Sequence, residues 1–126
     1  MATATSFVKS RRVREQTFTL TYADTTASVV ATLPAGARIL AWICNTTIAF
    51  VTGTTTISIG YTSTSNELVS GHSVAAIGET EPSTTVALPG HETTALTEIY
   101  AKCGASNTAG TVHVTMVFSI EEGTPF

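Results

Sequence analysis

The sequence predicts an all-β protein built as a single β-sandwich of jelly-roll-like type, with an extended basic N-terminal arm. Three observations lead to this prediction. Thr is the commonest residue, and β-branched side chains fit strands better than helices. Short runs of alternating polar and apolar residues recur, with turn signals roughly every eight to twelve residues. Long polar connections in the second half of the chain suit crossovers between two sheets.

The first part of the chain divides into an arm and two strands. Residues 1–15 are predicted as the arm, residues 16–120 as the folded domain and residues 121–126 as a tail. Thr17–Tyr22 alternates strictly, which is typical of a half-buried strand, and Ser28–Leu33 predicts a second strand. Pro34-Ala35-Gly36 then predicts a turn, because Pro fixes φ and Gly permits positive φ.

The stretch Leu33–Gly60 is the densest apolar segment and is predicted to form the central hairpin. Its strand Ala37–Cys44 has apolar residues on both faces, as expected for a central strand covered on both sides. Leu40 and Trp42 are predicted to share one face, which either packs inside the sandwich or forms a candidate oligomer interface. Residues 45–47 are polar and predict the end of this strand. Thr55–Gly60 is then predicted as the second strand of the hairpin.

The second half of the chain alternates polar loops with strands. Loops are predicted for residues 61–73 and 78–83, which are rich in Ser, Thr, Gly and Glu. Strands are predicted for Val74–Ile77, Thr85–Leu88, Thr97–Cys103 and Thr111–Ile120, the last being the most regular alternation in the chain.

Charge is concentrated at the N-terminus, although the formal net charge is −3. Four of the six basic residues are Lys9, Arg11, Arg12 and Arg14. A basic segment ahead of an acidic domain suits docking on an acidic protein surface, and it is equally typical of a solvated terminus. Phe7 is the one aromatic residue beside these charges, too few for stacking on bases, which argues against nucleic acid as a partner.

The sequence contains no catalytic or metal-binding motif. His72, His91 and His113 lack metal-ligand spacing, and no Gly-x-Ser-x-Gly motif or phosphate loop is present. We therefore expect a non-enzymatic protein without metal or cofactor. Cys44 and Cys103 are expected to be small buried hydrophobes, because no secretory signal indicates an oxidising compartment. No run reaches transmembrane length, so a membrane is not an expected partner.

A second hypothesis is a glycan-binding module. Trp42, Tyr61 and Tyr100, together with the Thr- and Ser-rich loops, could form a shallow site in which aromatic faces stack on sugars. Trp42 lies in the most apolar strand, however, and a core position suits it better.

Three segments resemble small virion structural proteins of tailed bacteriophages. These are the turn Leu33–Ala37, the strand Thr56–Gly60 and the strand Gly110–Val114, and the resemblance covers roughly residues 17–120. It implies a β-sandwich that acts as a capsid decoration (cement) protein on the head surface, made in the cytoplasm of the host bacterium. The alternative is a glycan-binding head-fibre or tail-associated module that aids host attachment.

The hypothesis of a capsid decoration protein also implies binding partners. The major capsid protein would bind the arm through Lys9, Arg11, Arg12 and Arg14. A homo-oligomer would engage several coat subunits at once, which strengthens binding without any new contact. We expect a trimer, with a dimer as the alternative, and Leu40 and Trp42 as its candidate interface.

Overall fold

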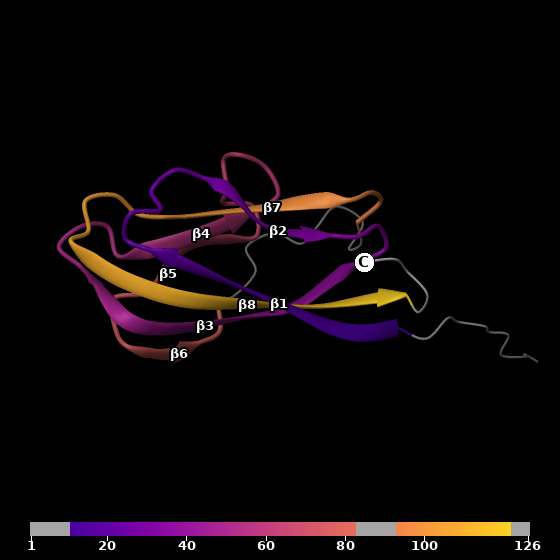
Figure 1. Ribbon diagram of the computed structural model, residues 1–126, viewed down its shortest axis with the longest axis horizontal. Helices are drawn as coiled ribbons and strands as arrows, with labels where there is room; N and C mark the ends of the chain where they lie inside the picture. The colour runs from indigo at the N-terminus through magenta and orange to yellow at the C-terminus, as the bar shows by residue number, and fades with distance from the viewer. Residues whose placement is uncertain (1–10, 83–92, 122–126) are drawn as a thin grey trace, which may run out of the picture.

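The computed structural model describes residues 11–82 and 93–121, without the side chains of Arg11 and Glu121. These residues form strands and no helix, in two layers that face each other (Figure 1). The strands are β1 (Arg11–Thr21), β2 (Ser28–Leu33), β3 (Arg38–Val51), β4 (Thr56–Gly60), β5 (Val69–Ser73), β6 (Gly78–Thr80), β7 (Thr97–Cys103) and β8 (Ala109–Glu121). The predicted all-β sandwich is confirmed.

The two sheets have four strands each, in the orders β1-β8-β3-β6 and β2-β7-β4-β5. Every described strand pair is antiparallel. Strands β4 and β5 pair with each other, whereas every other two consecutive strands lie in opposite sheets. This repeated crossing makes the strand order jelly-roll-like, as the long polar connections predicted.

The alternation of polar and apolar residues correctly predicted the positions of three strands. The bounds of β2 and β7 agree with the predicted strands, and β8 exceeds its prediction by a few residues. In β8 the side chains of the inner face, from Val112 to Ile120, are buried between the sheets. The residues between them are mostly half-buried on the outer face, which produces the regular alternation seen in the sequence.

The predicted hairpin over Leu33–Gly60 is wrong. Strand β3 lies between β8 and β6, whereas β4 lies in the other sheet between β7 and β5. The prediction of a central strand is confirmed, but β3 does not end at residues 45–47. It continues to Val51 through register shifts between Thr46 and Ile48 and between Ile48 and Val51. Such bulges change which side chains face inward, so the alternation disappears while the pairing continues.

Four other elements differ from expectation. Strand β1 begins at Arg11, inside the segment predicted as the arm. Strands β5 and β6 lie in segments predicted as loops, and Val74–Ile77 forms a connection instead of a strand. The predicted strand Thr85–Leu88 lies outside the described residues.

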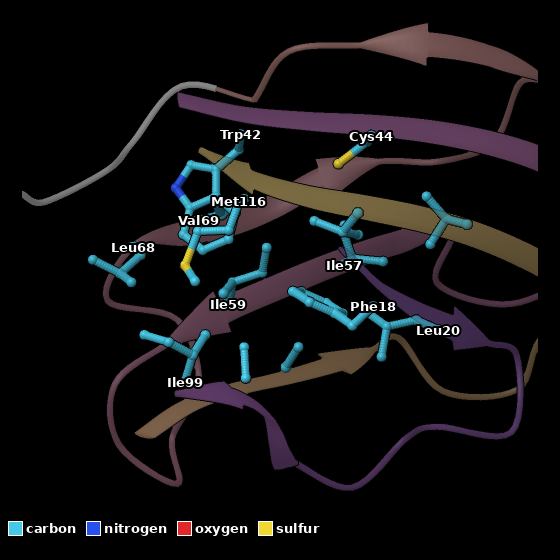
Figure 2. Packing of buried hydrophobic residues seen from close by; sticks show 14 of the residues in the cluster. Phe18, Leu20, Trp42, Cys44, Ile57, Ile59, Leu68, Val69, Ile99 and Met116 are labelled. Carbon is cyan, nitrogen blue, oxygen red and sulfur yellow. The ribbon is translucent and has the colours of Figure 1, made fainter. Parts of the chain in front are cut away.

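The core fills the space between the sheets. Trp42 lies opposite Met116 in the β3–β8 pair, and both side chains are fully buried (Figure 2). Ile57 and Ile59 of β4 and Ile99 of β7 face them from the other sheet. Fully burying a side chain of this size contributes about 1.5–3 kcal/mol to stability. The side chains buried between the two sheets therefore supply most of the driving force for folding.

The turn predicted at Pro34-Ala35-Gly36 is confirmed, and Thr93 fixes it. Gly36 has a φ of 81°, which favours glycine. The buried Thr93 hydroxyl donates to the Pro34 carbonyl at 2.6 Å and accepts the Ala37 N–H at 2.9 Å. Thr93 also makes backbone hydrogen bonds to Gly36 and Ala37. The entry to β3 is thereby tied to the segment that leads into β7.

Each side of the sandwich is closed by a hydrogen bond between edge strands of different sheets. On one side Gln16 Nε2 of β1 donates to the Thr32 carbonyl of β2 at 2.7 Å. On the other side His72 Nε2 of β5 lies 2.7 Å from Thr80 Oγ1 of β6. Strands β1 and β6 are therefore the two edges of one sheet, each joined to its neighbour in the other.

Candidate interaction surface

The middle of the outer face of the β1-β8-β3-β6 sheet is rich in uncharged side chains, while Glu15, Arg38 and Glu79 lie on the same face around it. Residues opposite one another share a face, so the register defines rows of side chains across the strands. One row contains Thr17, Thr115 and Ile43, and the two threonine Oγ atoms lie 3.1 Å apart. The next row contains Thr19, His113, Asn45 and Glu79, with Thr19 Oγ1 2.9 Å from His113 Nδ1. A face of this chemistry can dock on protein without desolvating many charges.

Leu40 and Trp42, predicted to share a face, lie on opposite sides of this sheet. Strand β3 has a register shift between Ile39 and Ala41, so Leu40 is the extra residue of a bulge. Leu40 is 51% exposed, whereas Trp42 is 1% exposed. Alternation alone had placed both on one side, because a bulge cannot be seen in the sequence. Trp42 therefore belongs to the core, and Leu40 is the member of the pair that can contact another chain.

The basic residues of the predicted arm occupy an edge strand. Arg11, Arg12 and Arg14 belong to β1, and Lys9 lies outside the described residues. Arg14 is opposite Phe118, which is fully buried, so the Arg14 side chain lies on the side of the sheet that faces the other layer. It is nevertheless exposed, as is Arg12. Arg12 and Arg14 thus lie along a rim of the folded sandwich.

Part of the β1 backbone also faces outward. The Tyr22 N–H donates to the Gly110 carbonyl at 3.1 Å, which shows that even-numbered residues of β1 bond to β8. In an antiparallel pair the intervening residues direct their N–H and C=O groups away from that partner. The Thr21 N–H does so and donates to Asp24 Oδ2 at 2.7 Å. Asp24 caps this edge at one end.

The β4–β5 connection carries a carboxylate held by hydroxyl groups. Glu67 Oε1 accepts the Tyr61 N–H at 3.1 Å, and Glu67 Oε2 accepts from the hydroxyls of Thr62 and Thr64. Burial acts to raise the pKa of Glu67, but the hydrogen bonds from the Thr62 and Thr64 hydroxyls and from the backbone of Glu67 and Thr62 outweigh it and lower the pKa to about 2. No sequence pattern indicates this contact, because it forms within a loop that composition alone marks only as polar.

Neither the histidines nor the cysteines form a chemical site within the described residues. No group of three His, Cys, Asp or Glu side chains there could hold a metal ion. His91 lies outside those residues, and burial lowers the pKa of His72. Cys44 and Cys103 are buried free thiols, as expected. Burial raises the pKa of Cys44 to about 12, which suppresses its thiolate form.

The aromatic residues of the glycan hypothesis do not form one exposed face. Trp42 is in the core and has no surface on which a sugar could stack. Tyr61 packs partly against the core, and Tyr100 lies on β7 opposite Gly60. As for membranes, the described part of the chain has no helix of the length and apolarity that a membrane span requires.

Comparison with known proteins finds similarity in structure only. No protein-family profile matches the chain, and no curated protein matches it in sequence. A chain of the cyanophage Pam1 capsid asymmetric unit matches with a TM-score of 0.64 and 16% identity, over 95% of this chain and 97% of that chain. A chain of the acid-stable capsid of Helicobacter pylori bacteriophage KHP30 matches with a TM-score of 0.60 and 13% identity, over 88% of this chain and 94% of that chain. The three chains share a fold over most of their lengths.

Proposed function

We propose that this protein is a non-enzymatic structural component of a phage virion, and specifically a capsid decoration (cement) protein. It binds the outer surface of the major capsid protein shell and stabilises the head, after synthesis in the cytoplasm of the host bacterium. The observation that supports this best is the match to chains of two phage capsids, which extends over nearly the whole of each chain. Because both matched chains are covered almost completely, they are of similar size to this 126-residue chain.

The surface of the sandwich suits this role. A cement protein must bury neutral area on a shell, and the outer face of the β1-β8-β3-β6 sheet offers rows of Thr, Val, Ala and Ile side chains. The basic residues Lys9, Arg11, Arg12 and Arg14 are proposed to dock on acidic coat surface. The protein is proposed to act as a homo-oligomer, a trimer in preference to a dimer, with Leu40 available at a contact between chains.

Binding to capsids tests the proposal. Purified protein is added to capsids of the phage that encodes it, assembled without this chain, and the bound fraction is measured by co-sedimentation. We expect saturable binding that raises the temperature at which the capsids disassemble. Capsids that neither bind the protein nor gain stability would overturn the proposal.

A set of variants tests the docking residues separately. A chain without residues 1–10 keeps every described strand, and Arg11→Glu changes one charge at the start of β1. Each should weaken capsid binding about tenfold, and salt should weaken binding of the wild type. Lys102→Glu makes the same charge change on β7 of the other sheet and should bind normally. An equal loss of capsid binding in the Lys102→Glu variant would show that the docking residues are misassigned.

A further inference from the structure

Residues 75–81, which include β6, form a strap that lies between two buried anchor residues. Val74 before the strap and Pro82 after it are both buried. The Val74 N–H donates to the Thr55 carbonyl at 2.9 Å, and the Val74 carbonyl accepts the Phe50 N–H at 3.2 Å. Every residue of the strap, by contrast, is exposed or half-buried. The strap can therefore leave the sheet without drawing a fully buried side chain out of the core.

Between its anchors the strap is attached by a short strand pairing and by one side-chain hydrogen bond. Strand β6 pairs with β3 from Gly78 opposite Thr46 to Thr80 opposite Cys44, at the edge of the sheet (Figure 1). The hydrogen bond joins His72 Nε2 and Thr80 Oγ1 at 2.7 Å, and we call it the clasp. A short pairing with exposed side chains belongs to the least stable parts of a fold. The clasp therefore has a large share in holding the strap closed.

The two side chains of the clasp meet at the rim of the space between the sheets. Residues opposite one another in a strand pair share a face of the sheet. His72 is opposite Ile57 and Thr80 is opposite Cys44, and both of these partners are fully buried. His72 is itself half-buried, whereas Thr80 is exposed. The clasp thus closes this side of the sandwich beside Cys44.

No described carboxylate pairs with His72. Strands β4 and β5 contain no acidic residue. Glu79 of β6 lies on the outer face of the sheet, and Glu81 is exposed just beyond the strand. On β3 the titratable group beside Thr80 is the buried Cys44 thiol, and Arg38 lies at the other end of that strand. A proton on His72 therefore places an uncompensated charge at a half-buried position, and burial lowers the pKa of His72.

We propose that the strap is opened by acid: when His72 takes up a proton, the clasp opens and residues 75–81 leave β3. Strand β3 then becomes the edge of the sheet, and Cys44 becomes accessible to solvent. The Thr80 hydroxyl can accept from the protonated ring, so the cost of protonation comes from burying the charge.

Linkage gives the direction of the effect. The pKa of His72 in the closed form lies below the ordinary value of 6.5, which the ring regains when the strap opens. The closed form is therefore favoured fully above about pH 6.5 and loses this advantage as the pH falls through the lower value. The inference does not rest on the proposed capsid role.

Thiol labelling of the wild-type chain tests the strap. The probe is dithiodipyridine, and peptide mass spectrometry measures its reaction with Cys44 and Cys103 separately. Each rate is divided by that of a free cysteine peptide at the same pH. We expect this ratio for Cys44 to rise about three- to tenfold from about pH 8 to about pH 5.5, the upper limit for one group of ordinary pKa 6.5. Cys103 is buried in the other sheet and reports global unfolding, so its ratio should stay constant.

Three variants assign the response to the clasp. His72→Gln keeps a hydrogen-bonding nitrogen and takes up no proton, so its labelling ratio at Cys44 should not change with pH. Thr80→Val keeps the shape of the side chain without the hydroxyl and should raise the Cys44 ratio about two- to tenfold at pH 8. His113→Gln, on the outer face of β8, is the matched control and should keep the wild-type response.

Four results would overturn the inference. These are a Cys44 ratio that is equal at both pH values, a Cys103 ratio that rises in step with it, a pH response that survives in His72→Gln, and wild-type labelling in Thr80→Val. Circular dichroism shows whether each variant folds. The comparison of Cys44 with Cys103 in the wild type needs no variant, so it decides the question by itself.

Discussion

At the scale of single residues, Glu67 shows how a loop can be ordered by one carboxylate. The hydroxyls of Thr62 and Thr64 and the Tyr61 N–H all donate to it. Gly60 makes room for the arrangement, since a Cβ at that position would overlap Glu67 Oε1 and approach the Asn66 nitrogen to 2.8 Å. Glycine is required here by the close approach of a neighbouring group, and its backbone is ordinary.

The ionised form of Glu67 should stabilise the fold above its titration range. The folded pKa of about 2 lies below the ordinary value of 4.5, so this contribution is present above about pH 4.5 and disappears as pH falls toward 2. We expect Glu67→Gln to melt about 2–5 °C below wild type at pH 7, with the gap narrowing over that pH range. Thermal unfolding followed by circular dichroism measures this. Glu98→Gln, at an exposed position on β7, is the control and should show no such pH-dependent gap.

At the scale of elements, β3 places neighbouring apolar residues in opposite environments. Trp42→Ala should destabilise the fold by about 3–5 kcal/mol, because it leaves a cavity beside Met116. Leu40→Ala should change the free energy of unfolding by less than about 0.5 kcal/mol, because Leu40 is exposed on a bulge. Urea unfolding of the monomer measures both. Similar decreases in the free energy of unfolding for the two variants would contradict the burial described for Trp42 and Leu40 on β3.

The sequence placed elements well only where alternation and pairing coincide. Strands β7 and β8 alternate along their whole length and were predicted nearly to the residue. Strand β1 was predicted to start too late, because Arg12 and Arg14 occupy inward-facing positions that an alternation rule reserves for apolar residues. Bulges hid the second half of β3, and β6 is too short for any periodicity. The pairing of β1 with β8 is a property of topology that no local pattern contains.

The surface is harder to predict than the core, for a related reason. The basic residues are visible as charge in the sequence, but the position of Arg12 and Arg14 on an edge strand follows from the strand order of the described residues. Glu79 was read as part of a polar loop, and only the β3–β6 pairing makes it the opposite edge of the same sheet. Trp42 was correctly judged a better core residue than a sugar platform, since it lies in the most apolar strand.

At the scale of the whole molecule, the strand order should make folding slow. Strand β1 pairs along its length with β8, and β2 pairs with β7, so distant parts of the chain must meet before either sheet is complete. Domains dominated by such contacts fold in milliseconds to seconds. Refolding followed by the fluorescence of the single tryptophan, the buried Trp42, should show this range. Rates that do not change with protein concentration would separate folding from association, and a main phase faster than about 100 µs would contradict the expectation.

The register of β1 on β8 also determines how the fold bears mechanical load. Arg11 is the Cα partner of Glu121, so the two ends of the described chain lie side by side at one end of the molecule (Figure 1). The hydrogen bonds of an antiparallel pair lie across the strands. Tension applied between these two ends therefore opens the pair one bond at a time, like a zip, and meets little resistance. In the capsid role proposed above, outward pressure would have to be borne through the faces and edges of the sandwich, where many hydrogen bonds share the force.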